Sequence, residues 1–222
     1  MPWCSPGPPK SRAFTRDLTA AQVDRASKQS VYDSVRSSKG EAAIIADDPL
    51  LAQSEGKTFA SVNLAVALAQ RGSRVLLVDA DLRKPSVVRS LGLPDGEGSG
   101  LSSFLTGRHD IDRALRPFTA IPNLSVLPSG PIPPNPAELV SSPVMEELVR
   151  EFRRRFEHIV LDSPPLLLVT DGILLSTLAD GVVLVVESGA TTRGALNRAR
   201  RILDRAGANT LGAVLNKHPP TA

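Results

Sequence analysis

Residues 54–81 read SEGKTFASVNLAVALAQRGSRVLLVDAD, and this stretch decides the fold. It contains Gly56-Lys57-Thr58, the end of a phosphate-binding loop. Apolar residues then recur at helical spacing up to Gly72, a residue type that suits the end of a helix. The apolar run inside residues 73–81 does not alternate with polar residues, as expected of a strand covered by helices on both faces. A loop, a helix and a buried strand in this order predict an α/β domain whose loop holds a phosphate.

The rest of the chain continues the alternation of strands and helices. Further strands are predicted at 41–47, 124–130, 158–165, 180–188 and 210–217, and further helices at 144–156 and 192–208. This order predicts a P-loop NTPase-like α/β fold of three layers, with a mainly parallel central sheet flanked by helices. Ligands of such sheets bind at the carboxyl ends of the strands, so we expect the chemistry there.

The composition predicts one domain behind a flexible leader. The chain has 222 residues, of which 41% are hydrophobic and 22% are charged, as in ordinary globular proteins. Residues 1–28 start with a proline-rich segment that contains Cys4 and are predicted to be a flexible leader, whereas residues 29–222 are predicted to form the P-loop domain. A single cysteine and the lack of a long apolar run predict a cytoplasmic location. The net charge of +3 is dispersed, and no nucleic-acid partner is expected.

Gly56, Lys57 and Thr58 have the chemistry to bind a nucleotide. Glycine lets the backbone approach a phosphate closely, and the N–H groups at the start of the following helix favour an anion. Lys57 can reach the β- and γ-phosphates, and the Thr58 hydroxyl is placed to ligate Mg²⁺.

Acidic residues follow two of the predicted strands. Asp79 and Asp81 have i, i+2 spacing, which is expected to place both carboxylates on one side of an extended backbone. Such a pair suits Mg²⁺ binding and the acceptance of a proton from an incoming hydroxyl. Asp162 stands at the Walker B position, where a carboxylate holds the metal through water. Arg83 can pair with a phosphate or with a neighbouring carboxylate.

The predicted site therefore has three overlapping parts. The catalytic residues are Lys57, Asp79 and Asp81. The metal ligands are Thr58, Asp79, Asp81 and Asp162. The nucleotide contacts are Ser54, Glu55, Gly56, Lys57, Thr58, Phe59, Arg83 and Asn216, the last because an amide at a strand end can read the edge of a purine base.

Five stretches, in order, make the chain resemble the bacterial tyrosine kinases (BY-kinases) of capsule and exopolysaccharide synthesis. They are SEGKTFASVNLAVALAQRG (54–72), VLLVDADLRKPSV (75–87), GLSSFLTG (100–107), LPSGPIPPNPAELVSS (127–142) and HIVLDSPPLLLVTD (158–171). The block SGPIPPNPAELVSS is particularly specific, because it is not one of the general motifs of P-loop proteins. Mapped by motif, the resemblance assigns Lys57 and Thr58 to Walker A, Asp79 and Asp81 to the second acidic motif (Walker A′), and Asp162 to Walker B.

The resemblance implies an ATP-dependent kinase that uses Mg²⁺ and phosphorylates protein substrates on tyrosine. It also implies that copies of the chain assemble into rings. The activator implied is the cytoplasmic end of a membrane-bound regulator of polysaccharide chain length, which would hold the kinase at the inner face of the cell membrane.

The sequence departs from the family pattern in several places. Leu51 stands where the loop usually has its first glycine, only Arg36 remains of the charges of the E-x-x-R-x-x-R oligomer motif, and the single tyrosine is Tyr32. Two other hypotheses therefore stay open. One is a regulator of the export machinery that is not catalytic and binds ATP weakly or not at all. The other is a ParA/MinD-type ATPase, which ranks lower because Ala52 occupies the position of that group's signature lysine.

Overall fold

The structure is a computed structural model that describes residues 42–47, 56–94 and 98–217. Several sequence predictions fall outside these residues. They concern the leader 1–28 with Cys4, the residues Tyr32 and Arg36, and the loop residues Leu51, Ala52, Ser54 and Glu55.

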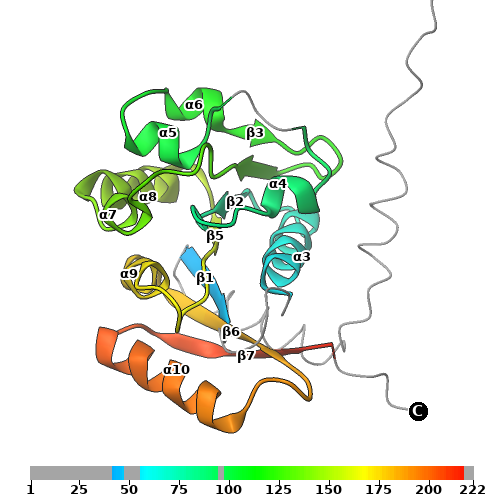
Figure 1. The fold of residues 1–222 in the computed structure, drawn as a ribbon. Helices are drawn as coiled ribbons and strands as arrows, with labels where there is room; N and C mark the ends of the chain where they lie inside the picture. Colours follow the sequence, from blue (N-terminus) through cyan, green and yellow to red (C-terminus); the bar gives the residue numbers. More distant parts are fainter. Residues whose placement is uncertain (1–41, 48–55, 95–97, 218–222) are drawn as a thin grey trace, which may run out of the picture.

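The strands of the described residues form one seven-stranded sheet with the order β3-β4-β2-β5-β1-β6-β7 (Figure 1). Their bounds are β1 (Ala42–Asp47), β2 (Val75–Asp79), β3 (Arg116–Pro117), β4 (Leu124–Leu127), β5 (His158–Asp162), β6 (Gly181–Glu187) and β7 (Thr210–Asn216). All neighbouring strands are parallel except β3 and β4. The predicted mainly parallel α/β sheet is confirmed.

The strands are shorter than the sequence predicted at their carboxyl ends. β4 and β5 stop at Leu127 and Asp162, before Pro128 and Pro164. Proline lacks the N–H group that a hydrogen bond to the neighbouring strand needs. Strand pairing therefore ends before the segment that the sequence pattern predicted as a strand. The residues after each strand are therefore loop residues at the edge where ligands bind.

The helices are α3 (Lys57–Gln70), α4 (Val87–Ser90), α5 (Leu101–Leu105), α6 (Ile111–Ala114), α7 (Pro136–Val140), α8 (Pro143–Arg155), α9 (Asp171–Leu178) and α10 (Arg193–Ala206). The three longest, α3, α8 and α10, are the predicted ones. The hydroxyls of Ser142 and Thr192 cap α8 and α10, and Gly207 ends α10 in a left-handed conformation. The other five helices and β3 were not predicted, because each spans too few residues to show a periodic pattern.

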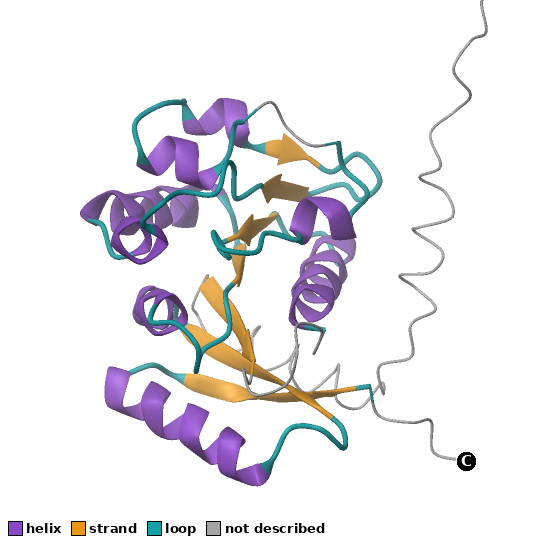
Figure 2. Ribbon diagram, in the orientation of Figure 1, coloured by secondary structure: helices purple, strands orange, loops and turns teal. Residues whose placement is uncertain are grey.

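Alternate residues of the central strands face two separate cores. In β2, Val75 and Leu77 belong to the core that also contains residues of α3 and α4, whereas Leu76 and Val78 belong to the core that also contains residues of α5, α8, α9 and α10. Figure 2 shows helices on both sides of the strands, with α3 and α4 on one side and α7, α8 and α9 on the other. This is the three-layer arrangement that the sequence predicted.

Two stretches that carry the resemblance lie against each other. The backbone N–H groups of Leu101 and Ser102, at the start of α5, donate to the carbonyls of Pro128 and Ser129, both at 2.8 Å. The Ser102 hydroxyl donates to the Pro131 carbonyl at 2.6 Å. A Cβ at Gly100 would lie 2.2 Å from the Gly130 nitrogen, so glycine is required for this close approach. The segment GLSSFLTG thus fixes the start of the proline-rich loop.

Candidate active site

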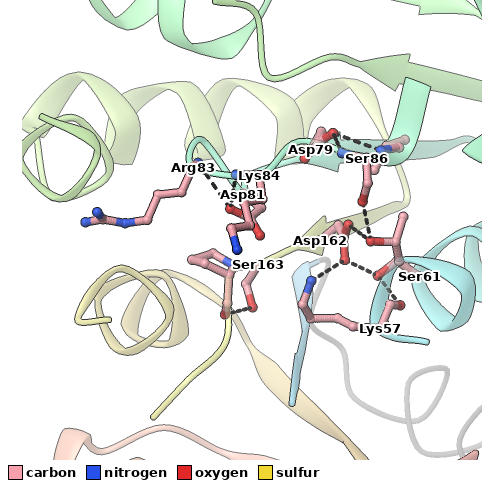
Figure 3. A network of polar contacts seen from close by, with 12 residues as sticks. Lys57, Ser61, Asp79, Asp81, Arg83, Lys84, Ser86, Asp162 and Ser163 are labelled. Carbon is pink, nitrogen blue, oxygen red and sulfur yellow. Dashed lines mark hydrogen bonds and ion pairs between the residues drawn. The ribbon is translucent and has the colours of Figure 1, made fainter. Parts of the chain in front are cut away.

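The carboxyl ends of three neighbouring strands bring the predicted residues together. β1 precedes the loop that ends at Gly56, β2 ends at Asp79, and β5 ends at Asp162. β5 lies between the other two strands, and Asp79 and Asp162 are paired in the register of β2 and β5. Figure 3 shows Lys57, Asp81 and Asp162 gathered at this edge.

Gly56 begins α3 in a conformation that favours glycine. Its φ of 85° and ψ of 22° are left-handed, and a Cβ would lie 1.9 Å from the Asn216 amide nitrogen. The N-cap residue of α3 is this glycine, which has no side chain to cap the first turn. A helix start behind a glycine fits an anionic phosphate, because the N–H groups of its first turn point toward the ligand and the N-cap residue offers no side-chain acceptor of its own. Asn216, which was predicted to contact the base, lies with its amide against this glycine.

Asp162 is the centre of the polar contacts at this edge, and its side chain is fully buried. Its carboxylate accepts hydrogen bonds from Thr58 Oγ1 at 2.7 Å and from Ser61 Oγ at 2.9 Å. Lys57 Nζ lies 3.6 Å from the same carboxylate, with the lysine side chain only 10% exposed. Burial raises the pKa of Asp162, and the Lys57 ammonium and the two hydroxyls oppose that rise. The Walker A lysine and hydroxyl therefore converge on the Walker B carboxylate.

Asp79 has a different environment from the one predicted. Its Oδ2 accepts the backbone N–H groups of Ser86 at 3.0 Å and Val87 at 2.9 Å. Burial, and then the nearby Asp162 charge, raise the pKa of Asp79 to about 7. The other oxygen, Oδ1, is buried without a hydrogen-bond partner. Asp79 thus holds the loop after β2 with one oxygen and leaves the other unsatisfied.

Asp81 lies beyond the end of β2, so the strand alternation that was expected to align it with Asp79 does not extend to it. Its Oδ1 accepts the backbone N–H groups of Arg83 at 3.1 Å and Lys84 at 2.9 Å. Asp81 as a whole residue is 5% exposed, whereas Asp79 is 0% exposed.

Arg83 pairs with a carboxylate, one of the two roles that the sequence allowed. Its Nε and Nη2 donate to the two oxygens of Asp171 at 2.8 and 3.0 Å, a bidentate pair. This bond raises the pKa of Arg83 further above its ordinary value. In Figure 3 the Arg83 side chain points away from Lys57 and Asp162. Asp171 at the start of α9 holds the guanidinium, and the predicted contact between Arg83 and the nucleotide stays a prediction.

The donor set fits Mg²⁺ only together with a nucleotide. Among the described residues, no three His, Cys, Asp or Glu side chains are arranged to hold a metal ion by themselves. The predicted metal ligands Thr58, Asp79, Asp81 and Asp162, the last of them through water, therefore stay a prediction. Mg²⁺ characteristically keeps several waters and binds through one or two protein groups plus substrate phosphates. The Thr58 hydroxyl, Asp162 and the unsatisfied Asp79 Oδ1 fit that mode of binding.

Two hydroxyl groups of the site were missed by the sequence analysis. Ser61 bonds Asp162, and it lies four residues after Lys57, on the same face of α3. That spacing was a usable signal. Ser86 Oγ lies 2.7 Å from Thr58 Oγ1, across 28 residues of sequence, and no local pattern indicates such a contact. Phe59 is half-buried in the first turn of α3, and its predicted nucleotide contact stays a prediction.

The chain is similar to a protein family, to curated proteins and to solved structures. Residues 54–206 match the AAA domain family. The tyrosine-protein kinase YwqD of Bacillus subtilis is 43% identical over 162 residues, which are 73% of this chain and 67% of YwqD. The solved structure of the chimerical protein CapA2B2 superposes with a TM-score of 0.82 at 32% identity and covers 93% of this chain and 90% of that protein.

A solved structure of a ParA/MinD-type ATPase is also similar to this chain, with a lower TM-score and a lower identity. The cell division ATPase MinD of Pyrococcus furiosus superposes with a TM-score of 0.68 at 26% identity, and the match covers 82% of this chain and 74% of MinD. In addition, none of the helices within the described ranges has the length and apolar character needed to cross a membrane.

Proposed function

The chain belongs to the bacterial tyrosine kinase family, and on this premise we propose that it transfers the γ-phosphoryl group of Mg-ATP to tyrosine residues of proteins. The contact set of Asp162 carries the proposal. A P-loop lysine, a P-loop hydroxyl and a buried carboxylate within hydrogen-bonding or ion-pairing distance are the parts that phosphoryl transfer uses. Catalysis of this reaction depends almost entirely on positioning and electrostatics, so few further groups are needed.

The roles of the nucleotide-binding residues follow from their positions. Gly56 and the first turn of α3 would hold a phosphate of the nucleotide, and Lys57 would exchange its contact with Asp162 for a phosphate oxygen. Thr58 would hold Mg²⁺ directly, and Asp162 would hold it through water. When bound, Mg²⁺ neutralises charge on the transferring group. The ion pair of Lys57 with Asp162 keeps the ammonium close to its working position before the nucleotide arrives.

Asp81 is the better candidate of the two predicted bases. Asp79 is 0% exposed, and one of its oxygens accepts two backbone N–H groups, so a tyrosine hydroxyl has little access to it. Asp81 is 5% exposed, and within the described part of the chain its hydrogen bonds from backbone N–H groups reach Oδ1 and not Oδ2. We assign Asp81 to orient the tyrosine hydroxyl and accept its proton, and Asp79 to hold the loop that carries Asp81.

The partners proposed rest on the family premise. They are a membrane-bound regulator of polysaccharide chain length as activator, a tyrosine-bearing protein as substrate, and further copies of this chain. Together with its activator, the kinase would act at the inner face of the cell membrane.

The proposal is tested by incubating the protein with γ-labelled ATP, Mg²⁺ and a tyrosine-bearing copolymer, with and without the cytoplasmic segment of a chain-length regulator. Label on tyrosine is expected in the wild type. Lys57→Met is expected to abolish it, and Arg205→Met, an exposed arginine on α10, serves as the control with wild-type transfer.

The alternatives give different results in the same assay. A melting temperature that rises with nucleotide, without any label on tyrosine, would favour the regulator hypothesis. Release of inorganic phosphate without phosphotyrosine would favour an ATPase of the ParA/MinD type. Either result would overturn the kinase proposal.

A further inference from the structure

Ser86 occupies the N-cap position of α4 but does not cap it. A serine at this position usually accepts a hydrogen bond from a backbone N–H of the first turn. Here that bond is absent. The hydroxyl instead lies 2.7 Å from Thr58 Oγ1, on a helix that is 28 residues earlier in the chain. The Ser86 hydroxyl therefore contacts the P-loop hydroxyl of Thr58 and not a backbone N–H group of its own helix.

The hydrogen atoms of this contact can be assigned by counting. A hydroxyl has one hydrogen to donate and two lone pairs to accept with. Thr58 donates its hydrogen to Asp162 Oδ2 at 2.7 Å. Ser86 must therefore be the donor to Thr58, and it occupies one lone pair of the threonine oxygen. One lone pair remains, in a direction fixed by the two other bonds.

The backbone of Ser86 is itself held in place. Asp79 Oδ2 accepts the N–H groups of Ser86 and Val87, at 3.0 and 2.9 Å, and Asp79 is 0% exposed. A continuous chain of hydrogen bonds thus leads from Asp79 through Ser86 and Thr58 to Asp162 (Figure 3). It links the loop after β2 to the start of α3 and to the end of β5.

We propose that Ser86 is a positioning residue that orients the Thr58 hydroxyl so that its remaining lone pair is available to Mg²⁺. This inference rests on the proposed nucleotide site. It assigns the Walker A′ loop a role through its serine, in addition to its carboxylates. Loss of the Ser86 hydroxyl leaves Thr58 able to rotate between Asp162 and other acceptors, which weakens the metal contact but not the phosphate contacts of Gly56 and Lys57.

The test measures the affinity for ADP by titration calorimetry, once with saturating Mg²⁺ and once with EDTA. The ratio of the two dissociation constants reports the gain in affinity due to the metal. Ser86→Ala is expected to reduce that gain about fivefold, the worth of one hydrogen bond, and to leave the affinity in EDTA unchanged. Ser86→Thr keeps a hydroxyl and is expected to retain most of the gain. Ser90→Ala, on the same short helix, is the matched control.

A second variant guards against a loss of folding in Ser86→Ala. Ser86→Cys has nearly the same shape but a weak donor, and it is expected to lose the metal-dependent gain as well. An unchanged gain in the folded Ser86→Ala and Ser86→Cys proteins would overturn the role of Ser86 and leave the nucleotide site standing. Equal losses with Mg²⁺ and with EDTA would also overturn it, because they would mark a structural role. Wild-type protein that binds no ADP in either condition would overturn the proposed function together with this inference.

Discussion

Removal of the Ser61 hydroxyl tests whether Asp162 is ionised and held by its neighbours. Ser61 and Asp162 are both 0% exposed, and the single hydrogen of Ser61 Oγ is shared between Asp162 Oδ1 at 2.9 Å and the Lys57 carbonyl at 3.1 Å. A hydrogen bond to a charged group contributes about 1.5–3 kcal/mol, against about 1 kcal/mol for a neutral pair. Asp162 keeps its contacts with Thr58 and Lys57. We therefore expect Ser61→Ala to lower the free energy of unfolding by about 2 kcal/mol.

The matched control is Ser176→Ala. Ser176 is also buried in a helix, but its hydroxyl donates to a neutral acceptor, the Ile173 carbonyl, at 2.6 Å. Both variants gain the same helix propensity of alanine, so that effect cancels in the comparison. Urea unfolding at fixed pH gives both values. The loss for Ser61→Ala is expected to exceed that for Ser176→Ala by about 1 kcal/mol.

The pH dependence of this difference provides an internal check. The Ser61 bond stabilises the ionised form of Asp162, so it lowers the pKa of a carboxyl group that burial raises. The excess loss in Ser61→Ala should be largest where Asp162 is ionised and should shrink as the pH falls through its pKa. Equal losses in the two variants at every pH would refute the assignment of Asp162 as an ionised centre of the site.

Three further predictions concern other parts of the site. The folded state raises the pKa of Asp79 from 3.8 to about 7, so folding favours the protonated form of this carboxyl group. The stabilisation that this provides, up to about 4 kcal/mol, should disappear as the pH rises from about 4 to above 7. Asp79→Asn should flatten this part of a profile of melting temperature against pH, and an unchanged profile would contradict the shift. Gly56→Ala should cost about 1–3 kcal/mol and abolish ADP binding, because its φ is positive and its Cβ would meet Asn216; calorimetry showing wild-type affinity would contradict this. Arg83→Met should lower the free energy of unfolding by about 1–2 kcal/mol, because it leaves the buried Asp171 carboxylate without its cation; the value is modest because the arginine side chain is 41% exposed. The double variant with Asp171→Leu should recover part of that loss in urea unfolding. A purely additive loss would argue against the pair.

The elements that could be predicted from the sequence are those with a strong local pattern. The uninterrupted apolar runs of β2 and β5, and the amphipathic repeats of α8 and α10, are set by which faces the fold buries, and both cores confirm them. The location of the site followed from the same pattern, since the carboxyl ends of parallel strands share one edge.

The details that could not be predicted depend on contacts between distant segments. The direction of the Asp79 carboxylate depends on where the backbone of Ser86 and Val87 turns, and the partner of Arg83 depends on the position of α9. Both follow from tertiary packing, which no spacing within residues 75–87 encodes. The short helices α4 to α7 were not predicted for a related reason. Helices of this length depend on tertiary contacts, such as the hydrogen bonds of Leu101 and Ser102, more than on the helix propensity of their residues.

The glycine at the start of α3 has a consequence for the life of the protein in the cell. The other two long helices, α8 and α10, follow a serine or threonine whose hydroxyl caps their first turn, whereas α3 follows a glycine. A bound phosphate group would complete that turn, and the ligand would then be a component of the folded state. Ligands that bind only the native state add RT ln(1 + [L]/Kd) to its stability, about 2.7 kcal/mol at a hundredfold excess over Kd. The half-life of this protein against proteases would then rise with the concentration of the nucleotide that it binds.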